Sequence, residues 1–107
     1  MDIEEIQQRI LAGHYLVSFT HTETLRRRRI SVETIEEAIR TGEIIEDYPN
    51  DPRGPSCLIH GVTREGRPIH VVCGTINSDQ IVIITAYEPN LEEWEHDWRT
   101  RKKGGAQ

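Results

Sequence analysis

Residues 57–87 read CLIHGVTREGRPIHVVCGTINSDQIVIITAY, and three runs within this stretch are rich in β-branched residues. Turn-forming residues bound each run. The pattern predicts strands over residues 57–63, 68–73 and 81–87, with turns at residues 65–66 and 77–78. Strands joined by tight turns pair antiparallel, so the stretch predicts an antiparallel meander.

The first turn predicts which residues of the first two strands lie opposite each other. If the hairpin turns about Glu65, Cys57 pairs with Cys73 on one face of the sheet. His60 then pairs with His70 on the other face. The two histidines are therefore expected side by side.

A two-residue second turn extends this arrangement to the third strand. It sets Thr85 opposite His70 and places Tyr87 on the same face. This mixed face is predicted to carry His60, His70, Val72, Ile83, Thr85 and Tyr87. The other face is predicted to pack against helices and to carry Cys57, Ile59, Ile69, Val71, Cys73, Val82 and Ile84.

The N-terminal part of the chain is predicted from apolar spacing and capping residues. Apolar residues at helical spacing follow Asp2 and predict a first helix that ends by Gly13. Residues 15–20 alternate as a strand does, and a short helix is predicted over residues 22–29. Ser31 caps a firmer helix, which stops at Gly42.

Three more segments complete the predicted elements. A strand is predicted over residues 43–48, and the proline-rich residues 49–55 form a loop. Leu91, Trp94 and Trp98 have helical spacing, so a last helix is predicted over residues 91–99.

This order of elements predicts an α+β fold. We expect four to five strands, two central helices and extra N-terminal and C-terminal helices, with an antiparallel meander in the second half of the chain. The 107 residues have room for one hydrophobic core. Residues 1–101 are therefore predicted to form a single domain, and residues 102–107 a flexible C-terminal tail.

Charge is unevenly distributed along the chain. Its 13 Lys and Arg stand against 18 Asp and Glu, a formal net charge of −5, which argues against broad, nonspecific nucleic-acid binding. The cations cluster at residues 26–29 and in the last nine residues, which hold four cations and no acid. A local arginine-lined cleft that engages RNA is still compatible with this distribution.

The sequence also predicts the cellular location. No stretch approaches the roughly 20 apolar residues of a spanning helix, and the acidic start does not resemble a secretory signal. We therefore expect a cytoplasmic protein with no membrane partner. Cys57 and Cys73 can form either a cross-strand disulfide or, as a cytoplasmic location favours, a pair of apolar core thiols.

An ordered set of short motifs spans residues 15–89. They are His21, Arg28 before Ile30-Ser31, IEEAI at 35–39, GEIIEDY at 42–48, SCL at 56–58, RPIHVV at 67–72 and ITAYEP at 84–89. With these motifs the chain resembles the domain of unknown function 4258 family, which is grouped with the RelE-type and barnase-like endoribonuclease fold.

The resemblance implies a RelE-like core, in which a small antiparallel sheet packs on the two central helices. It also implies a toxin of a toxin–antitoxin pair. Its partners would be RNA, free or on the ribosome, and a cognate antitoxin, which in some family members carries a zinc-finger domain. The family usually has His-Ala, an Arg three residues after that Ala and a second Arg before Gly-Ile. Counted back from Ile30, Arg28 fills the second Arg position, Arg29 replaces the Gly, Thr24 replaces the first Arg and His21 falls one place late.

A metal-independent ribonuclease needs a base, an acid and cations that stabilise the developing phosphorane. We assign His70 as acid or base and Arg28 to the phosphate, with His21 and Tyr87 completing the catalytic set. Thr85, His60 and Arg26 are assigned to substrate binding. The predicted reaction is RNA cleavage through a 2′,3′-cyclic phosphate.

Each of these residues also has a purely structural interpretation. His70 can be an ordinary polar strand residue, and the arginines at 26–29, which point about 100° apart, can form a solvated, salt-bridged helix. A zinc site would need His21 beside His60 and His70, but no metal-ligand spacing accompanies them, so no metal or other cofactor is predicted. Trp94 and Trp98 are interpreted as core or edge packing residues, or as a contact for a partner, rather than as platforms for base stacking.

The competing functional hypothesis is a protein of the same fold that lacks nuclease activity. Such a protein would work as a binding or regulatory module through a protein partner, and the acidic balance of the chain favours it slightly. The sequence leaves an oligomer open.

Overall fold

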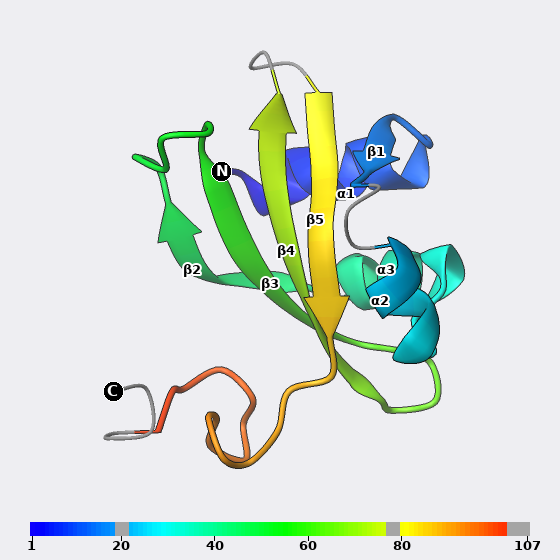
Figure 1. Cartoon of the computed structure of the whole chain (residues 1–107), viewed down its shortest axis with the longest axis vertical. Helices are drawn as coiled ribbons and strands as arrows, with labels where there is room; N and C mark the ends of the chain where they lie inside the picture. Colours follow the sequence, from blue (N-terminus) through cyan, green and yellow to red (C-terminus); the bar gives the residue numbers. More distant parts are fainter. Residues whose placement is uncertain (19–21, 77–79, 103–107) are drawn as a thin grey trace.

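The computed structural model describes residues 1–18, 22–76 and 80–102 and has an α+β fold. The elements are α1 (Ile3–Leu11), β1 (Tyr15–Val17), α2 (Thr22–Arg27), α3 (Val32–Arg40), β2 (Glu43–Tyr48), β3 (Ser56–Val62), β4 (Pro68–Ile76) and β5 (Gln80–Tyr87). Helices α1 and α3 lie over one face of a five-stranded sheet, and α2 lies beside β5 (Figure 1). Within the described residues, no helix is long and apolar enough to cross a membrane.

The sheet is mixed, so the prediction of a purely antiparallel sheet is wrong. Its strand order is β1-β5-β4-β3-β2, and β1 runs parallel to β5. The antiparallel direction is imposed only where a short turn joins two neighbouring strands. No such turn joins β1 to β5, because two helices and three strands separate them in the chain.

The first hairpin has the predicted register, and the second does not. Cys57 pairs with Cys73 and His60 with His70, as expected from a turn about Glu65. In the second hairpin, Tyr87 rather than Thr85 lies opposite His70.

Two irregularities explain the difference in the second hairpin. Ile76 pairs with Gln80, which leaves three residues between them instead of two, and the predicted turn at 77–78 lies outside the described residues. A bulge between Val72 and Cys73 then shifts the register again. As a result Ile83 joins the buried core while Val82 and Ile84 are only half-buried, the reverse of their predicted faces.

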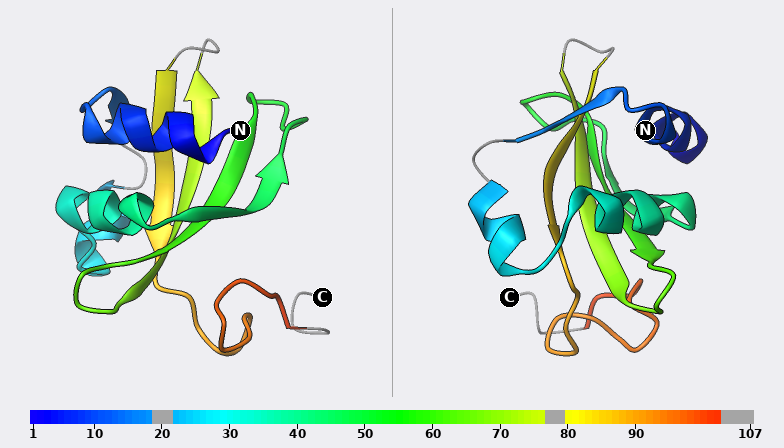
Figure 2. Two further views of the ribbon diagram at one scale, coloured as in Figure 1. Left: turned by 180° about the vertical axis from the view of Figure 1, so that it is seen from behind. Right: turned by 90° about the vertical axis from the view of Figure 1, so that its right-hand side faces the viewer.

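Capping residues explain where the two longer helices start. The Asp2 carboxylate accepts the backbone N–H of Glu4 at 3.0 Å and begins α1. Ser31 and Thr34 form a reciprocal capping box at the start of α3. Both helices lie across the same face of the sheet (Figure 2).

The hydrophobic core lies between these helices and the sheet. Each isoleucine it buries contributes on the order of 2 kcal/mol to folding. Cys57 and Cys73 are free thiols in this core, as the cytoplasmic interpretation expected, and burial raises the pKa of Cys57 to about 11. The fully buried members of the hydrophobic core include Ile6, Ile10, Ile35, Ile39, Ile59, Ile69, Val71 and Ile83.

The predicted C-terminal helix over residues 91–99 is absent from the structure. The Asn90 carbonyl accepts the N–H of Trp94 and closes a single helical turn. The Asp97 carboxylate then accepts the backbone N–H groups of Arg99 and Thr100, and the chain reverses direction. Trp98 takes a left-handed backbone conformation, φ 61°, at this reversal. We call residues 88–102 the C-terminal strap. Lys102 was predicted to belong to the flexible tail, but its N–H bonds the Glu93 carbonyl, so it is part of the strap.

Helix α3 touches β3 at a glycine. A Cβ at Gly61 would lie 1.7 Å from the Ala38 carbonyl oxygen, so no side chain fits there without moving the helix. The single hydrogen at Gly61 therefore sets the distance between the helical layer and the sheet.

Gly61→Ala should lower the free energy of unfolding by about 3 kcal/mol, because the methyl group forces α3 off the sheet. Gly66→Ala is the matched control, because Gly66 has φ 86° but open space around it. The control should lose only about 1 kcal/mol from backbone strain. Urea denaturation measures both, and equal losses would contradict the close contact.

Candidate functional site

The candidate site is a cleft where β5 leaves the sheet and the strap begins. It has a volume of about 500 Å³ and is lined by Arg28, Arg67, Tyr87, Glu88, Asn90, Glu93 and Trp94. Two predicted catalytic residues, Arg28 and Tyr87, are among them. A larger groove of about 740 Å³ between β1 and the α2–α3 turn is mainly apolar and contains none of the predicted catalytic residues that the structure describes.

The way α2 ends brings Arg28 to this cleft. The N–H of Ile30 bonds the Leu25 carbonyl at 3.0 Å, and the N–H of Arg29 bonds the Arg26 carbonyl at 3.1 Å. These two bonds form a Schellman motif, which requires a left-handed residue after the helix. Arg29 takes that conformation, with φ 58°.

Arg67 fastens this turn to the sheet. Its guanidinium donates to the carbonyl oxygens of Arg28 and Arg29, both at 2.9 Å, and pairs with the Glu88 carboxylate at 2.5 Å. Arg28 itself donates to the Ala86 carbonyl at 2.7 Å. Among the described residues no carboxylate pairs with Arg28. Its remaining N–H groups are therefore available as hydrogen-bond donors to an anion in the cleft.

His70 lies behind the cleft and is completely buried, with 0% of its surface exposed. Its Nε2 lies 2.7 Å from the Trp98 carbonyl oxygen, and its Nδ1 lies 3.3 Å from the Tyr87 hydroxyl. Because a carbonyl only accepts, Nε2 carries the hydrogen and Nδ1 accepts from Tyr87. Burial lowers the pKa of His70 to about 4, so the ring is neutral at pH 7.

His60 and Trp94 pack around this imidazole. The His60 ring meets His70 edge to face at 5.4 Å between centroids, and the Trp94 ring does so at 4.5 Å. The His60 Nδ1 and Trp94 Nε1 atoms are buried and have no hydrogen-bond partner within the described part of the chain. Burial also lowers the pKa of His60.

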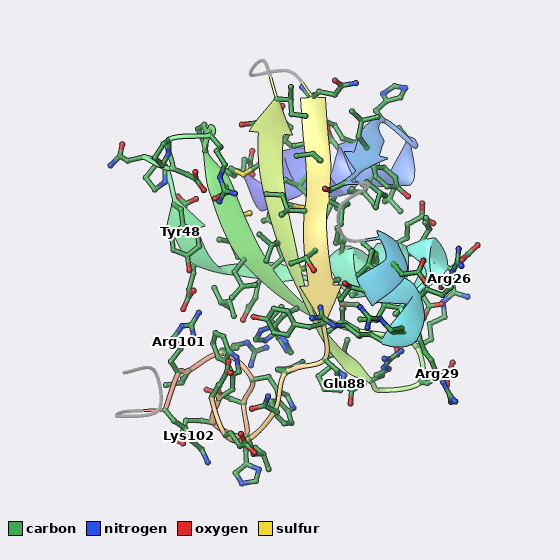
Figure 3. All side chains as sticks on the ribbon, viewed as in Figure 1. Arg26, Arg29, Tyr48, Glu88, Arg101 and Lys102 are labelled. Atoms are coloured by element: carbon green, nitrogen blue, oxygen red, sulfur yellow. The ribbon has the colours of Figure 1, made fainter. Side chains whose placement is uncertain are left out.

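Ion pairs to β2 hold the end of the strap. The Arg101 guanidinium donates to both carboxylate oxygens of Glu46, at 2.6 and 3.0 Å, and lies 4.6 Å over the Trp94 ring. Hydrogen bonding to Arg101 is the main reason that the pKa of Glu46 is lowered. Arg99 pairs with Glu43, which lies on the same strand as Glu46. Figure 3 shows Arg101 between the strap and the side of the sheet that carries Tyr48.

The structure brings together four of the predicted site residues. His70, Tyr87 and His60 form one cluster, and Tyr87 connects it to Arg28 through the shared cleft. Thr85 pairs with Val72, so side-chain alternation puts it on the same face, but it does not line the cleft.

The other two predicted residues are not placed at the cleft. Arg26 lines the apolar groove on the opposite side of α2 and pairs weakly with Glu23 at 3.9 Å (Figure 3). His21 lies outside the described residues.

The arrangement can bind an anion but keeps its imidazole from reacting. Arg28 and Arg67 face Glu88 and Glu93 in the cleft, so the formal charges balance. His70 has both ring nitrogens occupied and no exposed surface. Proton transfer by His70 therefore requires movement of the strap.

Arg67 and the strap were not predicted as parts of the site. Arg67 stands in the RPIHVV motif, which is the one signal that could have marked it, but its bonds to α2 depend on tertiary structure. The spacing of Trp94 and Trp98 suggested a helix, so sequence reasoning did not place Trp94 against His70.

Comparison with protein families identifies the family of the chain. The model of the family described as Domain of unknown function (DUF4258) matches residues 22–88, more than half of the chain. The match includes Arg28, Arg67, His70 and Tyr87 and stops where the strap begins. No curated protein and no solved structure matches the chain.

Arg29→Gly should raise the free energy of unfolding by about 0.5–1 kcal/mol, because glycine takes the left-handed conformation without steric cost. Arg27→Gly removes the same side chain from the last turn of α2, where glycine should cost about 1 kcal/mol. Urea denaturation should therefore shift in opposite directions for the two variants. Destabilisation by both would contradict the Schellman ending.

Acid should destabilise the protein through His70. Because its pKa is about 4 when folded and 6.5 when free, the unfolded chain binds the extra proton between these values. Stability is thus full above pH 6.5 and falls towards pH 4, by up to about 3 kcal/mol. His70→Gln should remove this part of the slope, and the exposed-site control His96→Gln should keep it. A slope unchanged in His70→Gln would rule out the buried neutral ring.

Proposed function

We propose that this chain, which belongs to the DUF4258 family, is a RelE-like endoribonuclease of toxin–antitoxin type that cleaves RNA without a metal ion. The observation that carries the proposal is the convergence of three residues from separate segments. Tyr87 and Arg28 line one cleft, and the Tyr87 hydroxyl lies 3.3 Å from His70 Nδ1.

Each of these side chains has a role in the proposed reaction. Arg28 binds the scissile phosphate and stabilises the charge that develops on it. Burial raises the pKa of Tyr87 to about 12, so its hydroxyl stays protonated, and when RNA binds it donates its hydrogen to a phosphate oxygen in place of His70 Nδ1. His70 acts as acid or base in the transfer of the proton from the 2′-hydroxyl to the departing 5′-oxygen, which leaves a 2′,3′-cyclic phosphate.

The proposal includes the setting in which the protein works. The substrate is RNA, free or bound to a ribosome, and the activity is held in check by a cognate antitoxin in the cytoplasm. The local cation at Arg28 supports recognition of a single phosphate rather than of a long stretch of nucleic acid.

The complete burial of His70 favours a second candidate function. A protein of the same fold with a permanently buried histidine would be a binding or regulatory module that acts through a protein partner. In that case the imidazole contributes only to packing and to the hydrogen bonds with Tyr87 and Trp98.

RNA cleavage in EDTA distinguishes the two candidates. The purified chain should cut free RNA or ribosome-bound RNA and leave 2′,3′-cyclic ends. Arg28→Ala and His70→Gln should each reduce kcat/KM by about 100-fold or more. Arg64→Ala removes an exposed arginine from the first hairpin and should leave cleavage unchanged.

Two results would count against the nuclease proposal. Activity that survives both Arg28→Ala and His70→Gln would contradict the assigned site. The absence of cleavage on every RNA, free or on ribosomes, would favour the binding module.

A further inference from the structure

We propose that the C-terminal strap is an autoinhibitory cover, which occupies the site of His70 and Arg28 and must detach from β2 before RNA can enter. This inference rests on the proposed function, because it concerns the regulation of that same site. The strap follows the family-matched region directly and crosses the open end of the sheet (Figures 1 and 2).

The strap fills the positions that a substrate would need. The Trp98 carbonyl oxygen takes the hydrogen bond of His70 Nε2, and the Trp94 ring, only 1% exposed, lies against the imidazole. Glu93 of the strap lines the same cleft as Arg28, so the strap brings a negative charge into the cleft where a phosphate would bind. This charge opposes the entry of an anionic substrate.

Closure also leaves unfavourable features under the strap. Trp94 Nε1 and His60 Nδ1 lose water without gaining a hydrogen-bond partner within the described residues. Trp98 holds a left-handed conformation that a bulky side chain rarely adopts. All three would be relieved when the strap lifts, so the net free energy that holds it down is smaller than its contacts suggest.

The ion pairs that hold the strap on β2 are partly exposed to solvent and lie outside the hydrophobic core. Arg99 and Glu43 are each about half exposed in side-chain surface, 52% and 50%, and Arg101 is 42% exposed. Such ion pairs are individually weak and are screened by salt. Helices α1 and α3 and the hydrophobic core between them and the sheet lie on the face opposite the strap, so the strap can lift without unfolding them.

Release would change the chemistry of the site in the direction that cleavage needs. The strap contains five Asp and Glu against three Lys and Arg, so its departure leaves the cleft more positive. His70 would gain contact with water, which moves the pKa of its ring back towards 6.5 and lets it exchange protons near neutral pH.

The test removes the two carboxylates that hold the strap. In Glu43→Gln/Glu46→Gln, hydrogen exchange of the Trp94 indole N–H, which is buried between the strap and His70, should speed up roughly tenfold, while the backbone amides of β3 and β4 keep the wild-type rate. RNA cleavage should rise by a similar factor. Glu4→Gln/Glu65→Gln is the control, because it removes the same charge from exposed positions away from the strap.

A variant on the other side of the ion pair checks the result. Arg101→Gln leaves β2 unchanged and should speed up exchange of the Trp94 indole N–H and raise RNA cleavage in the same way. Unchanged exchange in both variants would overturn the proposal. It would also be overturned if the wild-type protein cleaves RNA and the variants loosen the strap without raising that cleavage. A loosened strap with no cleavage by any form would instead refute the proposed nuclease function and leave a releasable cover.

Discussion

The register of the β3–β4 hairpin is the constraint on which the rest of the structure depends. Once Cys57 faces Cys73, alternation puts His60 beside His70 on the other side of the sheet. The apolar side then has to be covered by α1 and α3, whose isoleucines meet it. On the other side, the strap covers the histidines: Trp94 packs against His70 and the Trp98 carbonyl bonds its Nε2.

The sequence is informative where a feature depends on local spacing. The helices at Ile3–Leu11 and Val32–Arg40, the meander and the first register all follow from periodicity, caps and one turn. Features that depend on distant contacts were not predictable. The parallel direction of β1 depends on its pairing with β5, which lies far away in the chain, so local patterns gave the wrong answer there. The bulge beside Val72 interrupts the regular pairing that was counted from the turn. The reversal at Trp98 is local, since the Asp97 carboxylate accepts the next backbone N–H groups, but the spacing of the tryptophans favoured a helix instead.

The candidate site shows the same division. Pairing and resemblance together identified His70, Arg28 and Tyr87, which lie together, but they also pointed to Arg26, which lies on another side of α2. Consecutive arginines cannot share one helix face, so only the residue next to the left-handed turn reaches the cleft. Arg67, from the β3–β4 hairpin, donates hydrogen bonds to the carbonyls at the end of α2. Such a contact between distant segments cannot be predicted from the spacing of residues in the sequence.

Stability and reactivity of His70 are opposed in this fold. Two hydrogen bonds and full burial make the neutral ring a stabilising part of the closed structure, and the same environment prevents it from taking or giving a proton at pH 7. A nuclease built on this residue must therefore give up packing around Trp94 whenever it reacts. A binding module has no such requirement. The mobility of the strap, rather than the identity of the residues beneath it, is accordingly the property that separates the two functions.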